Sequence, residues 1–137
     1  MKIYQRRAAR KLIVQALYQH YHSHCSQEQL LADYLSRYRE NKVDIDYLKA
    51  GLTGVLEQQM AINEVLQEVI DRPLERLQPM EHVILQNAVH EMLYRPDVPI
   101  KTSINEAIEL AKKYGSIDGY RYVNGVLDAV VKKRQLI

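Results

Sequence analysis

Apolar residues recur at spacings of three and four along most of the chain, and strict alternation of apolar and polar residues is hard to find. This spacing places apolar side chains along one face of a helix. The first segment carries such a stripe, formed by Ala9, Leu12, Ile13, Ala16, Leu17 and Tyr21. The pattern therefore predicts an all-α protein, a compact bundle of about six or seven helices.

Polar residues at the ends of the stripes predict where the first helices begin. Ser26 precedes Gln29 by three residues, the spacing of a capping box, in which each side chain bonds an amide at the helix start. Asp44 or Asp46 can cap a third helix. Because the apolar phase of that helix continues as far as Asp71, we expect one long helix there.

Similar signals predict the later helices. Pro79 suits the first position of a helix, where no backbone N–H is needed. Ser103 and Glu106 have the spacing of another capping box, although Pro99 could start that helix one turn earlier. Asp118 is expected to cap the last helix.

Length and composition are those of an ordinary globular chain. It has 137 residues, of which 47% are hydrophobic and 26% charged, so we expect a single domain over residues 1–137. No apolar run approaches the roughly 18 residues of a membrane span, and the N-terminus lacks the apolar core of a signal peptide. The single cysteine, Cys25, excludes an internal disulfide and favours the reducing cytoplasm.

The formal net charge of +2 conceals an uneven distribution. Residues 1–11 hold five basic residues and no acidic ones, and residues 112–137 hold six basic and two acidic residues. The intervening residues 12–111 hold eight basic and 15 acidic residues. Two basic ends and an acidic middle indicate either a polyanion-binding face or two separate solvated tails.

The first basic end is rich in arginine. Arg6 and Arg10 share a face of the first predicted helix, and Arg7 flanks it. The helix dipole disfavours positive charge at this end, so capping does not explain these residues. Guanidinium groups bridge phosphates and stack on bases, so the pattern favours binding of an anion or RNA.

The second basic end carries tyrosines. All ten aromatic residues of the chain are Tyr. Three of them alternate with cations in the set Lys112, Lys113, Tyr114, Tyr120, Arg121 and Tyr122. This composition is typical of proteins that bind single-stranded RNA, but an ordinary solvated helix surface explains it equally well.

One run has the chemistry of a metal site, namely His20, His22, His24 and Cys25. Imidazole and thiolate suit zinc, but the run lies at a predicted helix end and no second His or Cys pair follows at suitable spacing. The run is more typical of a solvated helix end, and zinc binding is the alternative. Because the chain has no phosphate-binding loop, nucleophile elbow or metalloprotease motif, we expect neither an enzyme nor a cofactor.

Three segments together resemble the NusB family of transcription antitermination factors. The first is RRAAR at residues 6–10, followed by VQALY at residues 14–18. The second is DVP at residues 97–99, leading into INEAIELAK at residues 104–112. The third is YVNGVLD at residues 122–128, so the resemblance covers essentially the whole chain.

This resemblance implies two packed three-helix subdomains and a function in binding alone. NusB proteins bind the single-stranded boxA element of nascent RNA together with a small-subunit ribosomal protein, called NusE in this role. The pair helps assemble an antitermination complex on RNA polymerase, notably in ribosomal RNA operons. Whether the free protein forms a homodimer stays open.

The resemblance also implies site residues. Those for RNA are Arg6, Arg7, Arg10, Lys112, Lys113, Tyr120, Arg121 and Tyr122. Those for the protein partner are Tyr18 and an acidic helix with Glu75, Glu81 and Glu91. The chain has Gln86 and His90 where the family often has Arg and Tyr, which leaves the details of the partner contact open.

Two other functions are compatible with the same pattern. Some RNA methyltransferases begin with a NusB-like domain, but this chain ends at Ile137, which leaves no room for a methyl-donor domain. The second alternative is a helical protein-interaction scaffold that binds no RNA.

Overall fold

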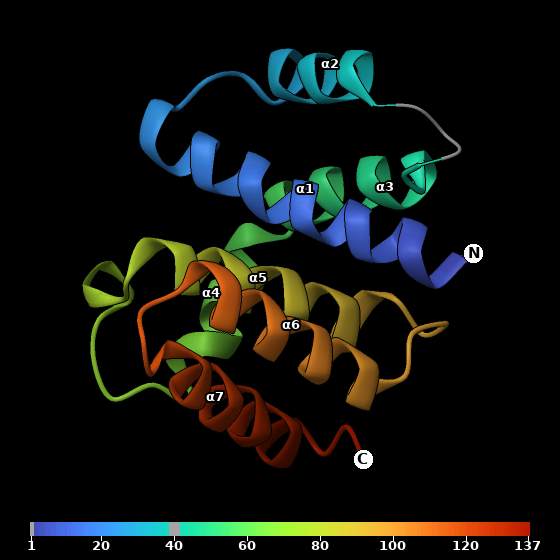
Figure 1. Cartoon of the computed structure of the whole chain (residues 1–137). Coiled ribbons are helices and arrows are strands. Elements are labelled where there is room, and N and C mark those ends of the chain that lie inside the picture. The colour runs from blue at the N-terminus through green and yellow to red at the C-terminus, as the bar shows by residue number, and fades with distance from the viewer. Residues whose placement is uncertain (1, 39–41) are drawn as a thin grey trace. The chain divides into compact units, whose positions relative to one another are not determined.

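The computed structural model describes residues 2–38 and 42–137, and all regular structure within them is helical (Figure 1). The elements are α1 (Lys2–Ser23), α2 (Gln27–Arg37), α3 (Ile45–Glu57), α4 (Gln59–Gln67), the short 3-10 helix η1 (Leu74–Arg76), α5 (Pro79–Tyr94), α6 (Ile100–Tyr114) and α7 (Gly119–Arg134). The prediction of an all-α protein is confirmed. The chain divides into two compact units, Met1–Glu57 and Gln58–Ile137. The prediction of one domain over residues 1–137 stays a prediction.

The first unit contains α1, α2 and α3, and α3 packs against both of the other helices. The predicted stripe of α1 is buried from Ala9 to Leu17, whereas Tyr21 is half-buried. α3 approaches α1 closely at Gly51, where an added Cβ would lie 2.5 Å from Ile13 Cδ1. The Ser26 side chain caps α2 by accepting the amide of Gln29 at 3.1 Å, as predicted.

The second unit is arranged around α5, which packs against α4, α6 and α7. Every residue of α5 from Glu81 to Met92 is buried. Pro79 occupies the first turn of α5, as predicted, and the Gln78 side chain caps the helix by accepting the amide of Glu81 at 2.9 Å. α6 and α7 run side by side in Figure 1, so both ends of the turn between them lie close together. This unit has four α-helices where the resemblance implied three.

The prediction of one long helix from the Asp44 region to Asp71 is wrong. α3 ends at Glu57, Gln58 leaves the helical conformation with φ −101° and ψ 16°, and α4 begins at Gln59. A break of one residue barely changes the phase of the apolar positions, so the stripe continues across it. The break coincides with the boundary between the two compact units.

Two other helix starts differ in detail from the prediction. α6 begins at Ile100, after Pro99, and Ser103 is buried in its second turn instead of capping it. Asp118 occupies the position before α7, but its side chain makes no capping bond. Within residues 2–38 and 42–137, no helix is long and apolar enough to cross a membrane.

Candidate nucleic-acid interface

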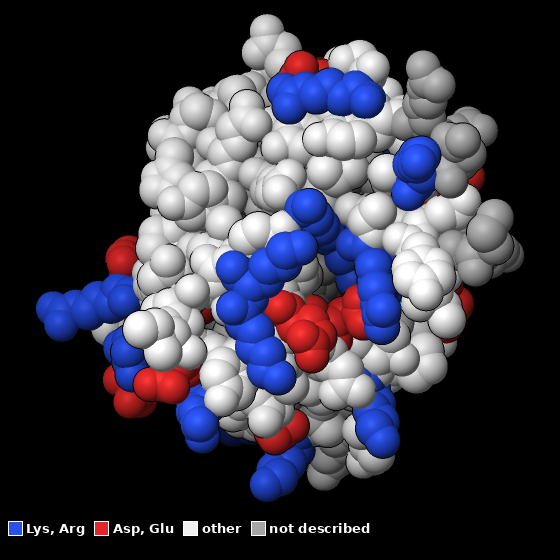
Figure 2. Space-filling model, in the orientation of Figure 1, with Lys and Arg blue, Asp and Glu red and all other residues white. Residues whose placement is uncertain are grey.

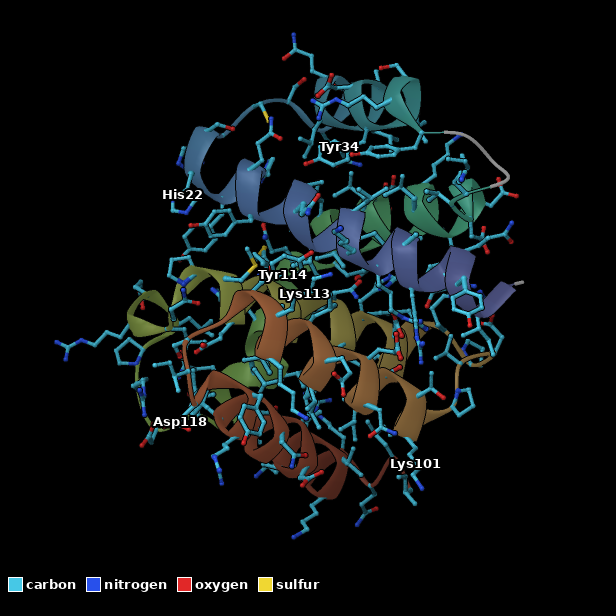
Figure 3. All side chains as sticks on the ribbon, viewed as in Figure 1. His22, Tyr34, Lys101, Lys113, Tyr114 and Asp118 are labelled. Atoms are coloured by element: carbon cyan, nitrogen blue, oxygen red, sulfur yellow. The ribbon has the colours of Figure 1, made fainter. Side chains whose placement is uncertain are left out.

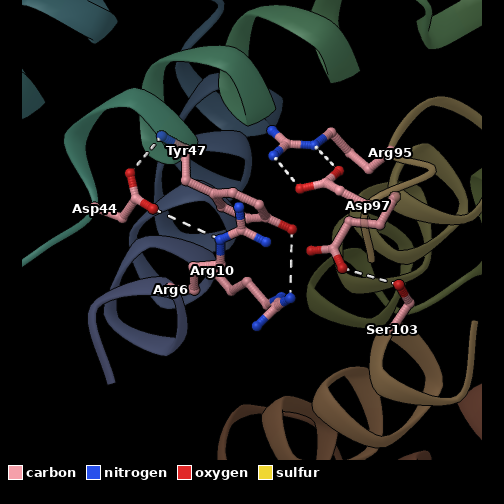
Figure 4. A network of polar contacts seen from close by, with 8 residues as sticks. Arg6, Arg10, Asp44, Tyr47, Arg95, Asp97 and Ser103 are labelled. Atoms are coloured by element: carbon pink, nitrogen blue, oxygen red, sulfur yellow. Dashed lines mark hydrogen bonds and ion pairs between the residues drawn. The ribbon is translucent and has the colours of Figure 1, made fainter. Parts of the chain in front are cut away.

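The arginines of α1 gather on one aromatic ring of α3. The Arg6 guanidinium lies 4.5 Å from the centre of the Tyr47 ring, and that of Arg10 lies 5.3 Å from it (Figure 4). Arg10 Nη2 donates to Tyr47 Oη at 3.3 Å, and Arg6 Nε lies 3.6 Å from Asp44 Oδ2. The ring attracts both cations and holds them in place. Arg6 and Arg10 therefore share a face, as predicted.

The three arginines differ in their access to solvent. Arg7 is exposed and the Arg6 side chain is 29% exposed, but Arg10 is only 5% exposed. Burial keeps Arg10 from meeting an external anion in this conformation, whereas Arg6 and Arg7 are accessible. Asp44 also caps α3, because its Oδ1 accepts the amide of Tyr47 at 3.0 Å.

In the second unit, cations from two helices meet on Tyr120. Lys112 Nζ of α6 and the Arg121 guanidinium of α7 lie 5.2 and 5.3 Å from the centre of this ring. Each cation also has a carboxylate nearby, Glu109 at 3.9 Å from Lys112 and Asp118 at 3.5 Å from Arg121. Both cations are exposed, so these ion pairs are weak and exchange readily with other anions. Acidic side chains lie among the basic ones over the face drawn in Figure 2.

Lys113 belongs to a different part of α6. Its Nζ lies 5.6 Å from the centre of the Tyr114 ring, and both residues are labelled towards the end of α6 in Figure 3. Lys113 is exposed and Tyr114 is half-buried. The structure therefore brings Lys112, Tyr120 and Arg121 together, and places Lys113 on a separate cation–ring pair.

Tyr122 lies one position beyond Arg121 and is half-buried. The Arg72 guanidinium lies 5.0 Å from the centre of the Tyr122 ring. Burial raises the pKa of the Tyr122 hydroxyl, and the positive charge of Arg72 opposes part of this effect. The hydroxyl is buried and has no hydrogen-bond partner within the part of the chain that the structure describes. Nothing in the sequence singled out Arg72, which comes from the loop before Pro73.

A pocket of about 380 Å³ lies between α7 and the segment that follows α4. Its lining residues are Val69, Ile70, Asp71, Arg121, Tyr122, Gly125 and Val126. Arg121 thus borders both the Tyr120 ring and the pocket. We call Lys112, Tyr120, Arg121, Tyr122 and Arg72 the α7 strip. These residues supply two aromatic rings and three cations, of which Arg72 also donates to Asp71 Oδ1 at 2.9 Å, and Arg121 and Tyr122 line the pocket.

The sequence profile of the NusB family matches residues 7–132. The chain belongs to the NusB family. Two relatives, both called transcription antitermination protein NusB, support this assignment. The one from Idiomarina loihiensis is 44% identical over 96% of this chain and 94% of its own length. The one from Shewanella amazonensis is 41% identical over 97% of this chain and 99% of its own length.

Solved NusB structures share the fold. NusB of T. maritima superposes with a TM-score of 0.82 at 31% identity, covering 93% of this chain and 90% of the other. A structure of NusB and NusE in complex with double-stranded RNA gives a TM-score of 0.83 at 20% identity, covering 97% and 99%. At that identity the second likeness supports the fold alone.

The acidic residues implied by the NusB resemblance do not form one exposed helix. Glu75 is exposed on η1, but Glu81 and Glu91 of α5 are only 6% and 2% exposed. Glu75 therefore lies on a different element from Glu81 and Glu91, and the role of the three residues in binding a partner stays a prediction. Glu81 and Glu91 can be buried because both carboxylates have internal donors. Glu91 Oε1 accepts from Ser103 Oγ at 2.9 Å (Figure 4), and Glu81 accepts from Ser116.

The other partner residues have mixed surroundings. Tyr18 is half-buried, with its ring edge-on to His22 at 4.5 Å. Gln86 and His90 are buried, and Gln86 Nε2 donates to Asn63 Oδ1 at 3.0 Å. Burial lowers the pKa of His90, and the negative charge of Glu91 opposes part of this effect. A role of these residues in binding a partner stays a prediction.

The histidine run closes α1. His24 adopts a left-handed conformation with φ 54°, and its amide bonds the carbonyl of His20 at 3.0 Å. His22 and His24 are exposed, whereas His20 and Cys25 are half-buried. Among residues 2–38 and 42–137, no group of three His, Cys, Asp or Glu residues is arranged to hold a metal ion.

Proposed function

We propose that this NusB-family chain is a transcription antitermination factor that acts by binding single-stranded RNA together with a ribosomal protein, without catalysis. Relatives at 41% and 44% identity carry the name of transcription antitermination protein. A NusB structure of the same fold holds both NusE and double-stranded RNA. On these grounds we further propose boxA RNA of ribosomal RNA transcripts as the ligand, NusE as the partner, and RNA polymerase as the site of assembly.

The observation that carries the RNA-binding proposal is the α7 strip. A base stacks on an aromatic face, and a neighbouring cation neutralises the phosphate beside it. Lys112 Nζ and the Arg121 guanidinium each lie within 5.3 Å of the centre of the Tyr120 ring, so two cations already flank one aromatic ring. The pocket beside Tyr122 combines apolar side chains with Asp71 and Arg121, and in this proposal it receives an unstacked base.

The arginines of α1 supply a second set of phosphate contacts in this proposal. Arg7 is exposed, and Arg6 is partly exposed above Tyr47. Arg10 is buried and bonds the Tyr47 hydroxyl, so it positions the ring on which Arg6 rests. We therefore assign direct contact to Arg6 and Arg7 and a positioning role to Arg10.

The partner protein is expected to be basic. Residues 12–111 carry 15 acidic and eight basic residues, which complements a basic ribosomal protein. Glu75 is the exposed carboxylate among the three expected partner residues, so direct charge contact is assigned to Glu75.

A titration of fluorescently labelled boxA RNA tests the proposal, with and without NusE and at two salt concentrations. The double variant Lys112→Ala, Arg121→Ala removes both cations from the Tyr120 ring. Its matched control is Lys132→Ala, Lys133→Ala, which removes two exposed cations from the last turn of α7.

We expect the first variant to bind weakly and to reduce the slope of log affinity against log salt by about 1.4, because each contact to a single-stranded phosphate contributes about 0.7. The control variant Lys132→Ala, Lys133→Ala should keep most of the salt dependence of RNA affinity. A scaffold without RNA binding would show neither affinity nor salt dependence, and a control that loses as much as the strip variant would remove the α7 strip from the proposal.

A further inference from the structure

Glu81 lies in the first turn of α5, yet its carboxylate serves the connection between α6 and α7. Oε2 accepts two hydrogen bonds from Ser116, one from the backbone amide at 3.0 Å and one from Oγ at 2.8 Å. Glu81 is 6% exposed, so the charged group is held inside the protein by these donors. Hydrogen bonds to a carboxylate are shorter and stronger than those between neutral groups.

Two glycines leave the space that this carboxylate occupies. A Cβ at Gly119 would collide with Glu81 Oε2 and Cδ, and a Cβ at Gly115 would lie 3.0 Å from the same oxygen. Gly115 ends α6 and Gly119 begins α7, so the carboxylate lies against both ends of the turn. The backbone of the turn therefore lies close to the Glu81 carboxylate at both glycines, where a larger residue would meet it.

The same turn sets the geometry of the α7 strip. Lys112 belongs to α6 and precedes the turn, whereas Tyr120 and Arg121 belong to α7 and follow it directly. Both cations lie near one ring because α6 packs against α7 and the turn brings the end of α6 next to the start of α7. A change in the turn would separate Lys112 from Tyr120 before any RNA is bound.

We propose that Glu81 is a positioning residue for RNA binding, which holds the turn from Gly115 to Gly119 and thereby presents Lys112, Tyr120 and Arg121 in one arrangement. This inference rests on the proposed function. It differs from the role implied by the NusB resemblance, in which Glu81 contacts the protein partner. When the carboxylate is removed, water can satisfy the amide and hydroxyl of Ser116, because Ser116 is exposed.

The test compares Glu81→Ala and Glu81→Gln with the unchanged chain in three measurements. These are titration with boxA RNA alone, titration with NusE alone, and hydrogen exchange of the Ser116 amide. The matched control is Glu64→Ala, which removes an exposed carboxylate of α4. Ser116→Ala removes the hydroxyl donor from an exposed position and carries the test if the Glu81 variants do not fold.

We expect Glu81→Ala to weaken RNA binding about three- to tenfold, the cost of re-ordering one or two long side chains on binding. The Ser116 amide should exchange faster, and affinity for NusE should not change. Glu81→Gln keeps an acceptor oxygen and should restore part of the RNA affinity. Ser116→Ala should lose about twofold, since one of the two bonds remains.

Two results would overturn the inference. The first is Glu81→Ala and Ser116→Ala binding RNA as tightly as the unchanged chain. The second is Glu81→Ala losing affinity for NusE while RNA affinity is kept, which would assign Glu81 to direct contact with the partner. If the unchanged chain binds no RNA, the proposed function itself fails. If the unchanged chain binds RNA and the Glu81 and Ser116 variants bind it equally well, only this inference fails, so the two failures are distinguishable.

Discussion

Asp44 has two separable tasks in the arginine-rich region. One oxygen caps α3 by accepting the amide of Tyr47, and the other lies 3.6 Å from Arg6 Nε. If Arg6 contacts phosphate, the Asp44 carboxylate competes with RNA for it. Asp44→Asn keeps a capping oxygen and removes the charge, whereas Asp44→Ala removes both.

The magnitudes follow from the exposure of the pair. Arg6 and Asp44 are 29% and 26% exposed, and such ion pairs are worth about 0.2–1 kcal/mol. Asp44→Asn should therefore change stability by less than about 1 kcal/mol. Its RNA affinity should rise by up to about fivefold, because about 1 kcal/mol of competition is removed. Asp44→Ala should lose about 1 kcal/mol more, the usual cost of a lost helix cap.

Urea unfolding followed by circular dichroism measures the stability of both variants, and RNA titration at low salt measures their affinity. Asp44→Asn should bind RNA more tightly than the unchanged chain, and addition of salt should reduce the gain. If Asp44→Asn keeps its stability but binds RNA more weakly, the carboxylate orients Arg6 and does not compete with phosphate, and the reasoning is refuted.

Three further predictions concern stability. Gly125→Ala should stabilise the chain by about 1 kcal/mol in urea unfolding, because the helix gains propensity and an added Cβ meets open space. Gly51→Ala gains the same propensity but overlaps the buried Ile13, which costs about 1–3 kcal/mol, so this variant should not exceed the unchanged chain in stability. Burial lowers the pKa of His82 and His90 from 6.5, so below that pH the unfolded chain binds more protons than the folded one. The free energy of unfolding should stay constant above pH 6.5 and decrease as the pH is lowered below 6.5. In the variant His82→Gln, His90→Gln this decrease should be smaller.

The helices could be predicted because their apolar stripes are local features of the sequence. α2, α3, α5 and α7 begin close to the predicted signals, since caps and prolines act on neighbouring amides. The break at Gln58 was missed because one non-helical residue leaves the phase of the stripe almost unchanged. Which compact unit each half of the stripe joins depends on tertiary packing, which periodicity does not contain.

The burial of charged residues depends on partners far away in the chain. Arg10 is 37 residues from the Tyr47 hydroxyl that it bonds, and Glu81 is 35 residues from Ser116. A sequence pattern marks these side chains as charged and hence as surface residues. The structure supplies the donors and acceptors that allow them to be buried.

The candidate RNA surface could be predicted in part. Tyr120, Arg121 and Lys112 were expected from their composition and from the NusB resemblance, and the structure brings them together. Arg72 joins the same surface from a loop about fifty residues away along the chain. The pocket beside Tyr122 likewise combines α7 with the segment after α4, so neither could be found before the fold was known.

In the proposed function, RNA contacts both the α7 strip and the exposed arginines of α1. Photo-crosslinking with boxA RNA that contains 4-thiouridine, followed by mass-spectrometric identification of the linked peptides, tests it most directly. We expect crosslinks to the peptide that contains Tyr120 and Tyr122 and to the one that contains Arg6 and Arg7. Crosslinks confined to other surfaces, such as α2 or the end of α7, would contradict it.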